Sequence, residues 1–204
     1  MTPGEKTPQR RIGLTGGIAS GKSSVGRWLE QQGIPVLDAD VYSRRALAAG
    51  TEASRTVLTR YGAQVASSSS DGIDRAALGR IVFKDRSERQ WLEELVHPLV
   101  HQAFSSDLSD HREEPVVVLM IPLLFEAGLE RLCSETWVVS CSPKQQLARL
   151  IQRDGLSELE ARSRISSQIP LEQKEQMADH VIDNSRTHVE LIRSLEKLNL
   201  GSNI

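Results

Sequence analysis

Residues 16–23 have the composition and spacing of a phosphate-binding loop. They read GGIASGKS and satisfy the pattern G-x-x-x-x-G-K-[ST]. Glycines let the backbone curl so that successive N–H groups meet phosphate oxygens, and a helix that follows adds its positive N-terminal end. Lys22 would bridge the β- and γ-phosphates of a nucleoside triphosphate, and the hydroxyl of Ser23 would complete the shell of a Mg²⁺ ion. Ser24 can help to hold the α-phosphate.

The alternative interpretation of this motif is a glycine-rich turn beside a solvated lysine. Its context favours nucleotide binding, because a short apolar strand is predicted over residues 11–15 and a helix from Lys22 onward. The motif alone does not separate kinases from GTPases or motor ATPases. No lysine of this chain lies in the Asn/Thr-Lys-x-Asp signature of guanine-specific proteins, and the chain is short for a motor.

Asp38 and Asp40 form a second group with chemical potential. They lie just past the predicted strand 35–38, at the carboxyl edge of the sheet, where open α/β folds bind their ligands. One carboxylate could order a metal or water shell while the other takes a proton from an acceptor hydroxyl. The alternative role for either aspartate is that of a helix N-cap.

The elements that position these residues alternate between strands and helices at both ends of the chain. Further strands are predicted at 116–121, 136–141 and 181–183, and the first of these reads as a strand buried on both faces of a parallel sheet. Capping patterns at Ser142 and Ser157 start two helices, and another is expected over 189–200. The first alternating region ends with a helix predicted over residues 40–49. Between the two alternating regions only helices are predicted, over residues 54–61, 74–83, 87–96 and 98–108. The rhythm predicts a parallel sheet covered by helices, interrupted by a helical insertion.

Composition describes an ordinary globular chain. Of the 204 residues, 39% are hydrophobic and 25% charged, and the net charge is −2. This balance argues against nucleic acid or an acidic membrane surface as a partner. The longest apolar run is far shorter than the ~20 residues that span a bilayer. Cys133 and Cys141 do not form a CxxC pair and suggest a reducing compartment. We therefore expect a cytoplasmic protein without nucleic-acid or membrane partners. The sequence does not determine the oligomeric state, which we take to be a monomer or weak oligomer.

Six segments together resemble the bacterial dephospho-CoA kinases. In order they are LTGGIASGKSS, VLDAD, LVHPLV, IPLLFE, SPKQQLARLIQRD and ADHVIDN, and the resemblance covers residues 11 to about 200. It implies transfer of the ATP γ-phosphate to the ribose 3′-hydroxyl of dephospho-coenzyme A, the last step of coenzyme A biosynthesis, with ATP and Mg²⁺ bound. A kinase for another small acceptor, such as a nucleoside monophosphate, and a non-enzymatic nucleotide switch are the alternatives.

The resemblance also implies roles for individual residues. Asp40 becomes the base on the 3′-hydroxyl, with Asp38 and His97 on the acceptor side. Arg149 and Arg153 become cations on the transferring phosphate, and their spacing of four places both on one helix face. The phosphate cradle and the adenine side then comprise Gly17, Ala19, Ser20, Gly21, Lys22, Ser23, Ser24 and Asn184. Glu126 follows a core strand, where an acidic metal ligand could stand, although the strand lacks the terminal aspartate of a Walker B sequence.

The expected fold is a P-loop kinase-like parallel sheet flanked by helices. The resemblance implies one domain over residues 11–204, with its core at 11–50, 111–152 and 177–204. A helical acceptor-binding insertion is expected at 51–110 and a helical lid at 153–176. Residues 1–10 carry two prolines and no apolar pattern, which predicts a flexible N-terminus.

Overall fold

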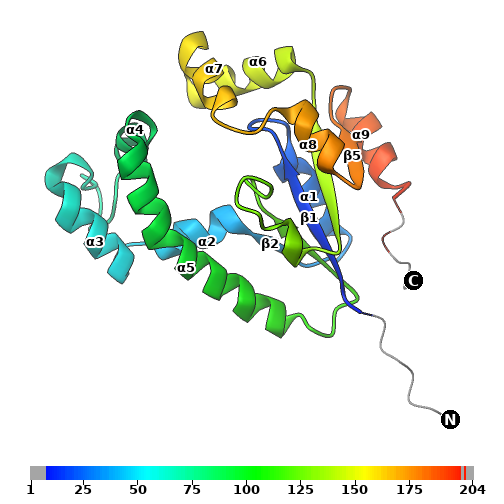
Figure 1. Ribbon diagram of the computed structural model, residues 1–204, viewed down its shortest axis with the longest axis horizontal. Helices are drawn as coiled ribbons and strands as arrows, with labels where there is room; N and C mark the ends of the chain where they lie inside the picture. Colours follow the sequence, from blue (N-terminus) through cyan, green and yellow to red (C-terminus); the bar gives the residue numbers. More distant parts are fainter. Residues whose placement is uncertain (1–7, 199, 201–204) are drawn as a thin grey trace. The chain divides into compact units, whose positions relative to one another are not determined.

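The computed structural model describes residues 8–198 and residue 200 (Figure 1). The chain divides into two compact units, one made of the residues up to Asp38 and from Asp110 onward, the other of Ala39–Ser109. Of the expected flexible segment 1–10, residues 1–7 lie outside the described residues. The first unit contains the sheet and the phosphate-loop motif, and the second is helical.

Five parallel strands form the sheet of the first unit, in the order β2-β3-β1-β4-β5. They are β1 (Arg10–Gly16), β2 (Val36–Asp38), β3 (Val116–Met120), β4 (Glu135–Ser140) and β5 (His180–Asp183). All five residues of β3 are buried, and the strand pairs with β2 on one side and β1 on the other. The predicted parallel sheet with a doubly buried β-branched strand is therefore confirmed.

The helices of this unit are α1 (Lys22–Gln31), α6 (Pro143–Asp154), α7 (Glu158–Ser166), α8 (Leu171–Met177) and α9 (His188–Leu195), with a 3₁₀ turn at Glu130–Leu132. One apolar cluster joins α1 and α9 to alternate residues of the strands. It includes Leu29 of α1, Leu195 of α9 and Trp137 of β4. Helix α8 contacts β4 beside the sheet (Figure 1). Capping boxes start α6 at Ser142 and α7 at Ser157, as the sequence predicts.

The second unit contains α2 (Ala39–Ala46), α3 (Glu52–Tyr61), α4 (Arg75–Lys84) and most of α5 (Arg86–Asp110), with a 3₁₀ turn at Gly62–Gln64. The ring of Tyr42 packs edge-on against Phe104 at 4.8 Å, and its hydroxyl donates to Asp107. These contacts hold α2 against α5, so α2 belongs to this unit. Asp74 caps α4 by accepting two backbone N–H groups.

Pro98 does not end a helix. The sequence predicts one helix over 87–96 and another over 98–108, which is wrong, because α5 runs continuously past this proline. A proline inside a helix removes one hydrogen bond and its ring strains the preceding turn. Packing offsets that cost on both sides. Trp91 joins the apolar cluster of the second unit before Pro98, and Phe104 packs on Tyr42 after it.

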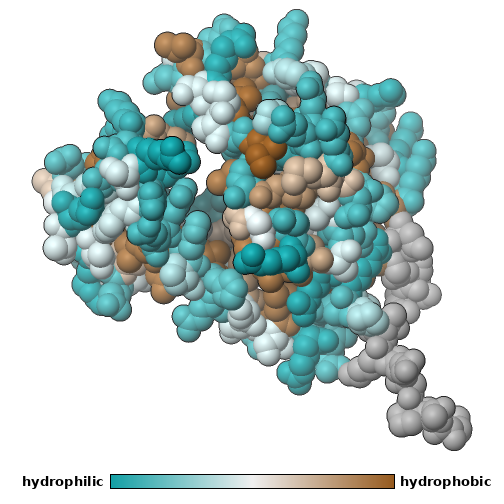
Figure 2. All heavy atoms as spheres, viewed as in Figure 1, coloured by the Kyte–Doolittle hydropathy of each residue, from teal (hydrophilic) through white to brown (hydrophobic). Residues whose placement is uncertain are grey.

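Hydrophobic residues are scattered among hydrophilic ones on the face shown in Figure 2. This is usual, because apolar atoms contribute more than half of a folded protein's surface. Within the described residues, no helix is both long enough and apolar enough to cross a bilayer.

Candidate functional site

The phosphate-loop motif connects β1 to α1, as the sequence predicts. Gly21 is the N-cap of α1 and has a φ of 105°, in the region that favours glycine. Ala19 has a φ of 59° and is the one non-glycine residue with positive φ in the described part of the chain. The first turn of α1 contains no acidic residue, so the turn itself adds no negative charge at the positive end of the helix dipole.

Backbone donors of this loop are available to a ligand. Among residues 8–198, no protein acceptor takes the N–H of Ala19, Gly21 or Ser23. The hydroxyl of Ser20 is buried and has no hydrogen-bond partner. An unsatisfied buried hydroxyl and a left-handed alanine both cost free energy, and such strain gathers at binding sites. The loop thus has free donors of the kind that phosphate oxygens require.

Asn184 and Arg149 hold the carbonyl side of the same loop. Asn184 Nδ2 donates to Ser20 O at 2.8 Å. Arg149 donates to Asn184 O at 3.0 Å and lies 3.5 Å from Ser20 O. A Cβ at Gly21 would overlap Asn184 Nδ2, so the amide packs directly on the loop. The resemblance to the dephospho-CoA kinases implies that Asn184 is on the adenine side, and the structure shows that its side chain is hydrogen-bonded to the backbone of the loop.

Two glutamines that the sequence reasoning missed hold the peptide groups of Ile18. Gln168 Oε1 accepts the N–H of Ile18 at 3.1 Å, and Gln146 Nε2 donates to its carbonyl at 3.0 Å. Gln146 is buried beside Leu150 on α6. A polar residue on the apolar face of an amphipathic helix was the available signal for Gln146, and Gln168 had none.

Lys22, Ser23 and Ser24 occupy the first turn of α1. Ser23 is an exposed residue. The described residues contain no group of three or more His, Cys, Asp or Glu side chains placed to hold a metal ion. Mg²⁺ does not need one, since it binds through few protein ligands together with substrate phosphates and waters. Glu126 pairs with the ammonium of Lys174, so its carboxylate is already engaged by a cation.

Asp38 ends β2 at the same edge of the sheet as the loop. The strands are parallel, and only β3 lies between β2 and β1, so Asp38 and Gly16 both stand at carboxyl ends. Asp40 follows two residues later in the first turn of α2 and is exposed. The covalent chain keeps its Cα within about 7 Å of that of Asp38.

Arg153 and His97 are the two remaining candidate site residues. Arg153 lies on α6 with Arg149, and its guanidinium makes two hydrogen bonds to Asp154, at 2.7 and 3.0 Å. That pairing lowers the pKa of Asp154. His97 is an exposed residue of α5.

Neither cysteine is prepared for nucleophilic chemistry. Cys133 and Cys141 are not joined in a disulfide. Burial raises the pKa of the Cys133 thiol to about 11 and also raises the pKa of Cys141. Both side chains therefore remain thiols at neutral pH and act as packing residues.

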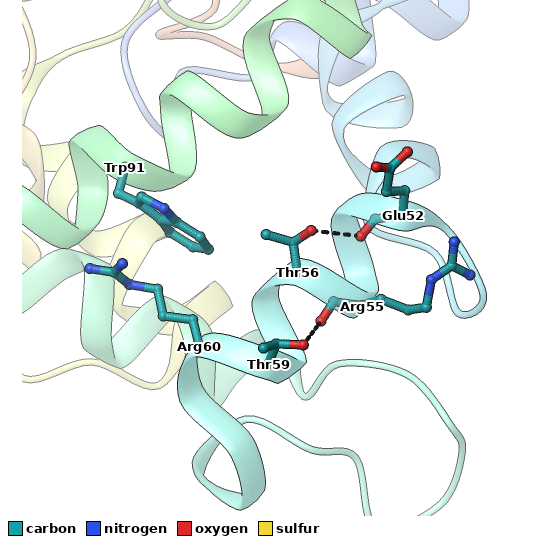
Figure 3. Close-up of a pocket in the computed structure, with 6 residues that line it drawn as sticks. All are labelled: Glu52, Arg55, Thr56, Thr59, Arg60 and Trp91. Atoms are coloured by element: carbon teal, nitrogen blue, oxygen red, sulfur yellow. Dashed lines mark hydrogen bonds between the residues drawn. The ribbon is translucent and has the colours of Figure 1, made fainter.

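A hollow of about 530 Å³ lies on the helical unit between α3 and α5 (Figure 3). Most of its polar side chains already have partners. The hydroxyls of Thr56 and Thr59 donate to carbonyls of their own helix. Arg60 lies over the ring of Trp91 and is paired with Glu88 at 2.8 Å. This hollow offers a ligand little polar recognition, and the phosphate loop remains the candidate site.

The chain is similar to known proteins over most of its length. The family model "Dephospho-CoA kinase" matches residues 10–190. A dephospho-CoA kinase of Synechococcus sp. (strain CC9605) is 63% identical over 184 residues, 90% of this chain and 89% of that protein. The crystal structure of TT1252 from Thermus thermophilus is 36% identical with a TM-score of 0.77, over 93% of this chain and 96% of that one. The dephospho-CoA kinase from Campylobacter jejuni is 25% identical with a TM-score of 0.65, over 91% and 95%.

Proposed function

Because the chain belongs to the dephospho-CoA kinase family, we propose that it transfers the γ-phosphate of ATP to the ribose 3′-hydroxyl of dephospho-CoA. The product is coenzyme A. The observation that carries this proposal is the loop between β1 and α1, which has free backbone donors and lies within the matched residues. The transition state of phosphoryl transfer is loose, so positioning and charge neutralisation account for most of the catalysis.

The phosphates of ATP lie on residues 19–24 in this proposal. Lys22 contacts the β- and γ-phosphates, and the backbone N–H groups of Ala19, Gly21 and Ser23 bind the remaining oxygens. The Ser23 hydroxyl would hold Mg²⁺, which when bound neutralises charge on the β- and γ-phosphates. Arg149 braces the loop and, with Arg153, supplies positive charge on the side of α6. The segment 153–176 acts as the lid that excludes water.

The acceptor hydroxyl meets Asp40. A carboxylate that accepts the hydroxyl proton raises the nucleophilicity of the oxygen as it attacks the γ-phosphorus. Asp38 orders the same edge of the sheet, and His97 belongs to the helical unit that binds the acceptor.

Replacing Asp40 tests the base directly. General acid–base groups contribute about 10²–10⁴-fold, so Asp40→Asn should lower kcat by at least a hundredfold with little change in ATP affinity. The matched control is Asp71→Asn, an exposed aspartate of the same unit. Mass spectrometry of the reaction with ATP, Mg²⁺ and dephospho-CoA detects the product. Wild-type turnover by Asp40→Asn would refute the assignment, and a faster reaction with a nucleoside monophosphate would identify a different acceptor.

Replacing Lys22 tests the phosphate cradle. Lys22→Ala should weaken nucleotide binding and turnover together, because the same ammonium contacts the phosphates in the ground state and the transition state. Lys144→Ala, at an exposed position of α6, is the control. Unchanged ATP binding by Lys22→Ala would contradict the proposed loop.

A further inference from the structure

Lys174 is a fully buried charged residue in the segment 153–176, and the proposed mechanism gives its side chain no individual role. Its side chain on α8 is 0% exposed, and its Nζ lies 2.7 Å from Glu126 Oε1. The Glu126 side chain is 19% exposed. Desolvating two charges costs about as much as their attraction returns, so a buried ion pair is weak evidence of a stabilising role. The position of this pair suggests another reason for it.

The carboxylate of Glu126 holds two points of one short segment. The oxygen that pairs with Lys174 also accepts the N–H of Ile169 at 3.1 Å. The residue before Ile169 is Gln168, whose Oε1 accepts the N–H of Ile18 in the phosphate loop. Glu126 Oε1 thus holds both Ile169 and Lys174. Because Gln168 is next to Ile169 in the chain, this oxygen also determines where the Gln168 side chain contacts Ile18.

A second connection leads from Lys174 to the start of the same loop. Its Nζ lies 3.5 Å from Pro122 O, which also accepts a hydrogen bond from Thr15 Oγ1 at 3.1 Å. Thr15 is fully buried in β1, immediately before Gly16. Lys174 is thus connected to the phosphate loop in two ways. One connection runs through Pro122 O to Thr15 in β1, and the other runs through Glu126 and the segment 168–169 to Ile18.

We propose that Lys174 is a positioning residue for the nucleotide donor. By holding the Glu126 carboxylate, it places Gln168 against Ile18 and so sets the position of the phosphate-loop backbone. This inference rests on the proposed function, because it takes that loop as the ATP site. The acceptor is bound elsewhere, so loss of the pair affects the donor and not the acceptor.

The decisive variant removes both charges. Lys174→Met alone would leave Glu126 without its cation and destabilise the fold. In Lys174→Met/Glu126→Leu neither charge remains, and apolar replacement of a buried pair is often neutral for stability. Gln168→Leu removes only the contact with Ile18. The control is Arg112→Met/Glu113→Leu, which removes an exposed ion pair in the connection between α5 and β3, with side chains 72% and 65% exposed.

Calorimetric titration with a non-hydrolysable ATP analogue measures donor binding without any acceptor. We expect both the double variant and Gln168→Leu to bind the analogue about three- to tenfold more weakly, the range for loss of one hydrogen bond. Their KM for dephospho-CoA should stay within about twofold, and the control should match wild type in both values. If the pair only stabilised the fold, its loss would lower the melting temperature, and analogue binding and the KM for dephospho-CoA would change together or not at all.

Wild-type analogue binding by a folded double variant would overturn the inference. If the double variant does not fold, Gln168→Leu decides, and unchanged binding by it overturns the inference equally. A wild-type enzyme that binds the analogue but makes no coenzyme A would refute the proposed function and leave the binding result valid.

Discussion

Ala19 has a left-handed backbone conformation in the phosphate loop, and we therefore expect its replacement by glycine to increase the stability of the protein. Ala19 has a φ of 59°, a conformation that costs an L-residue roughly 1–2 kcal/mol. Glycine adopts it without that strain but loses about 0.5–1 kcal/mol more conformational entropy on folding. Ala19→Gly should therefore stabilise the sheet-containing unit by about 0–1.5 kcal/mol, with a central value near 0.8 kcal/mol. An alanine-to-glycine change usually destabilises a protein.

Thermal unfolding followed by circular dichroism measures this effect. For a chain of this size ~1 kcal/mol shifts the midpoint by about 2–4 °C, so Ala19→Gly should raise it by about 2 °C. The matched control is Ala148→Gly, the same change at an exposed position inside α6. It should lower the midpoint by a similar amount, because glycine costs about 1 kcal/mol in a helix interior.

Nucleotide binding provides the second measurement. The loop keeps its N–H donors in Ala19→Gly, so the affinity for ATP should stay within about threefold of wild type. A fall in the midpoint equal to that of Ala148→Gly would refute the reasoning, because it would mean that Ala19 is not strained in the protein without ligand.

Two further predictions concern other contacts. Gly21→Ala should abolish ATP binding in a folded protein, because a Cβ there overlaps Asn184 Nδ2 and glycine supports its φ of 105°; retained affinity in a calorimetric titration would show that the loop is not the site. The pKa of Asp179 is lowered because the backbone N–H and the hydroxyl of Thr136 donate to its carboxylate. Ionised Asp179 therefore stabilises the folded protein above its unfolded pKa near 3.8. This stabilisation disappears as the pH falls through the lower pKa of Asp179 in the folded protein. Urea unfolding should show Asp179→Asn about 1 kcal/mol less stable than wild type at pH 7, after allowing for solvent exposure. The two proteins should converge as the pH falls through the lowered pKa of folded Asp179, and a difference that stays the same throughout an acid titration would contradict this.

Local sequence was sufficient for the parallel sheet and for the phosphate loop. The run Val116–Met120 predicts a buried strand because its β-branched side chains suit the middle of a sheet. The loop was recognisable because glycine spacing and a lysine at a helix start are local requirements of phosphate binding. The capping boxes at Ser142 and Ser157 are local as well, and both helices start where they predict.

Contacts between distant residues were decided only by the tertiary structure. Pro98 marks a break by every local rule, yet α5 continues because Trp91 and Phe104 pack on either side of it. Lys174 lies on a short, mostly polar helix, and nothing in its neighbours foretells complete burial against Glu126, 48 residues away in the chain. Burial and pairing depend on which segments the fold brings together. A sequence motif records only the geometry that neighbouring residues impose on one another.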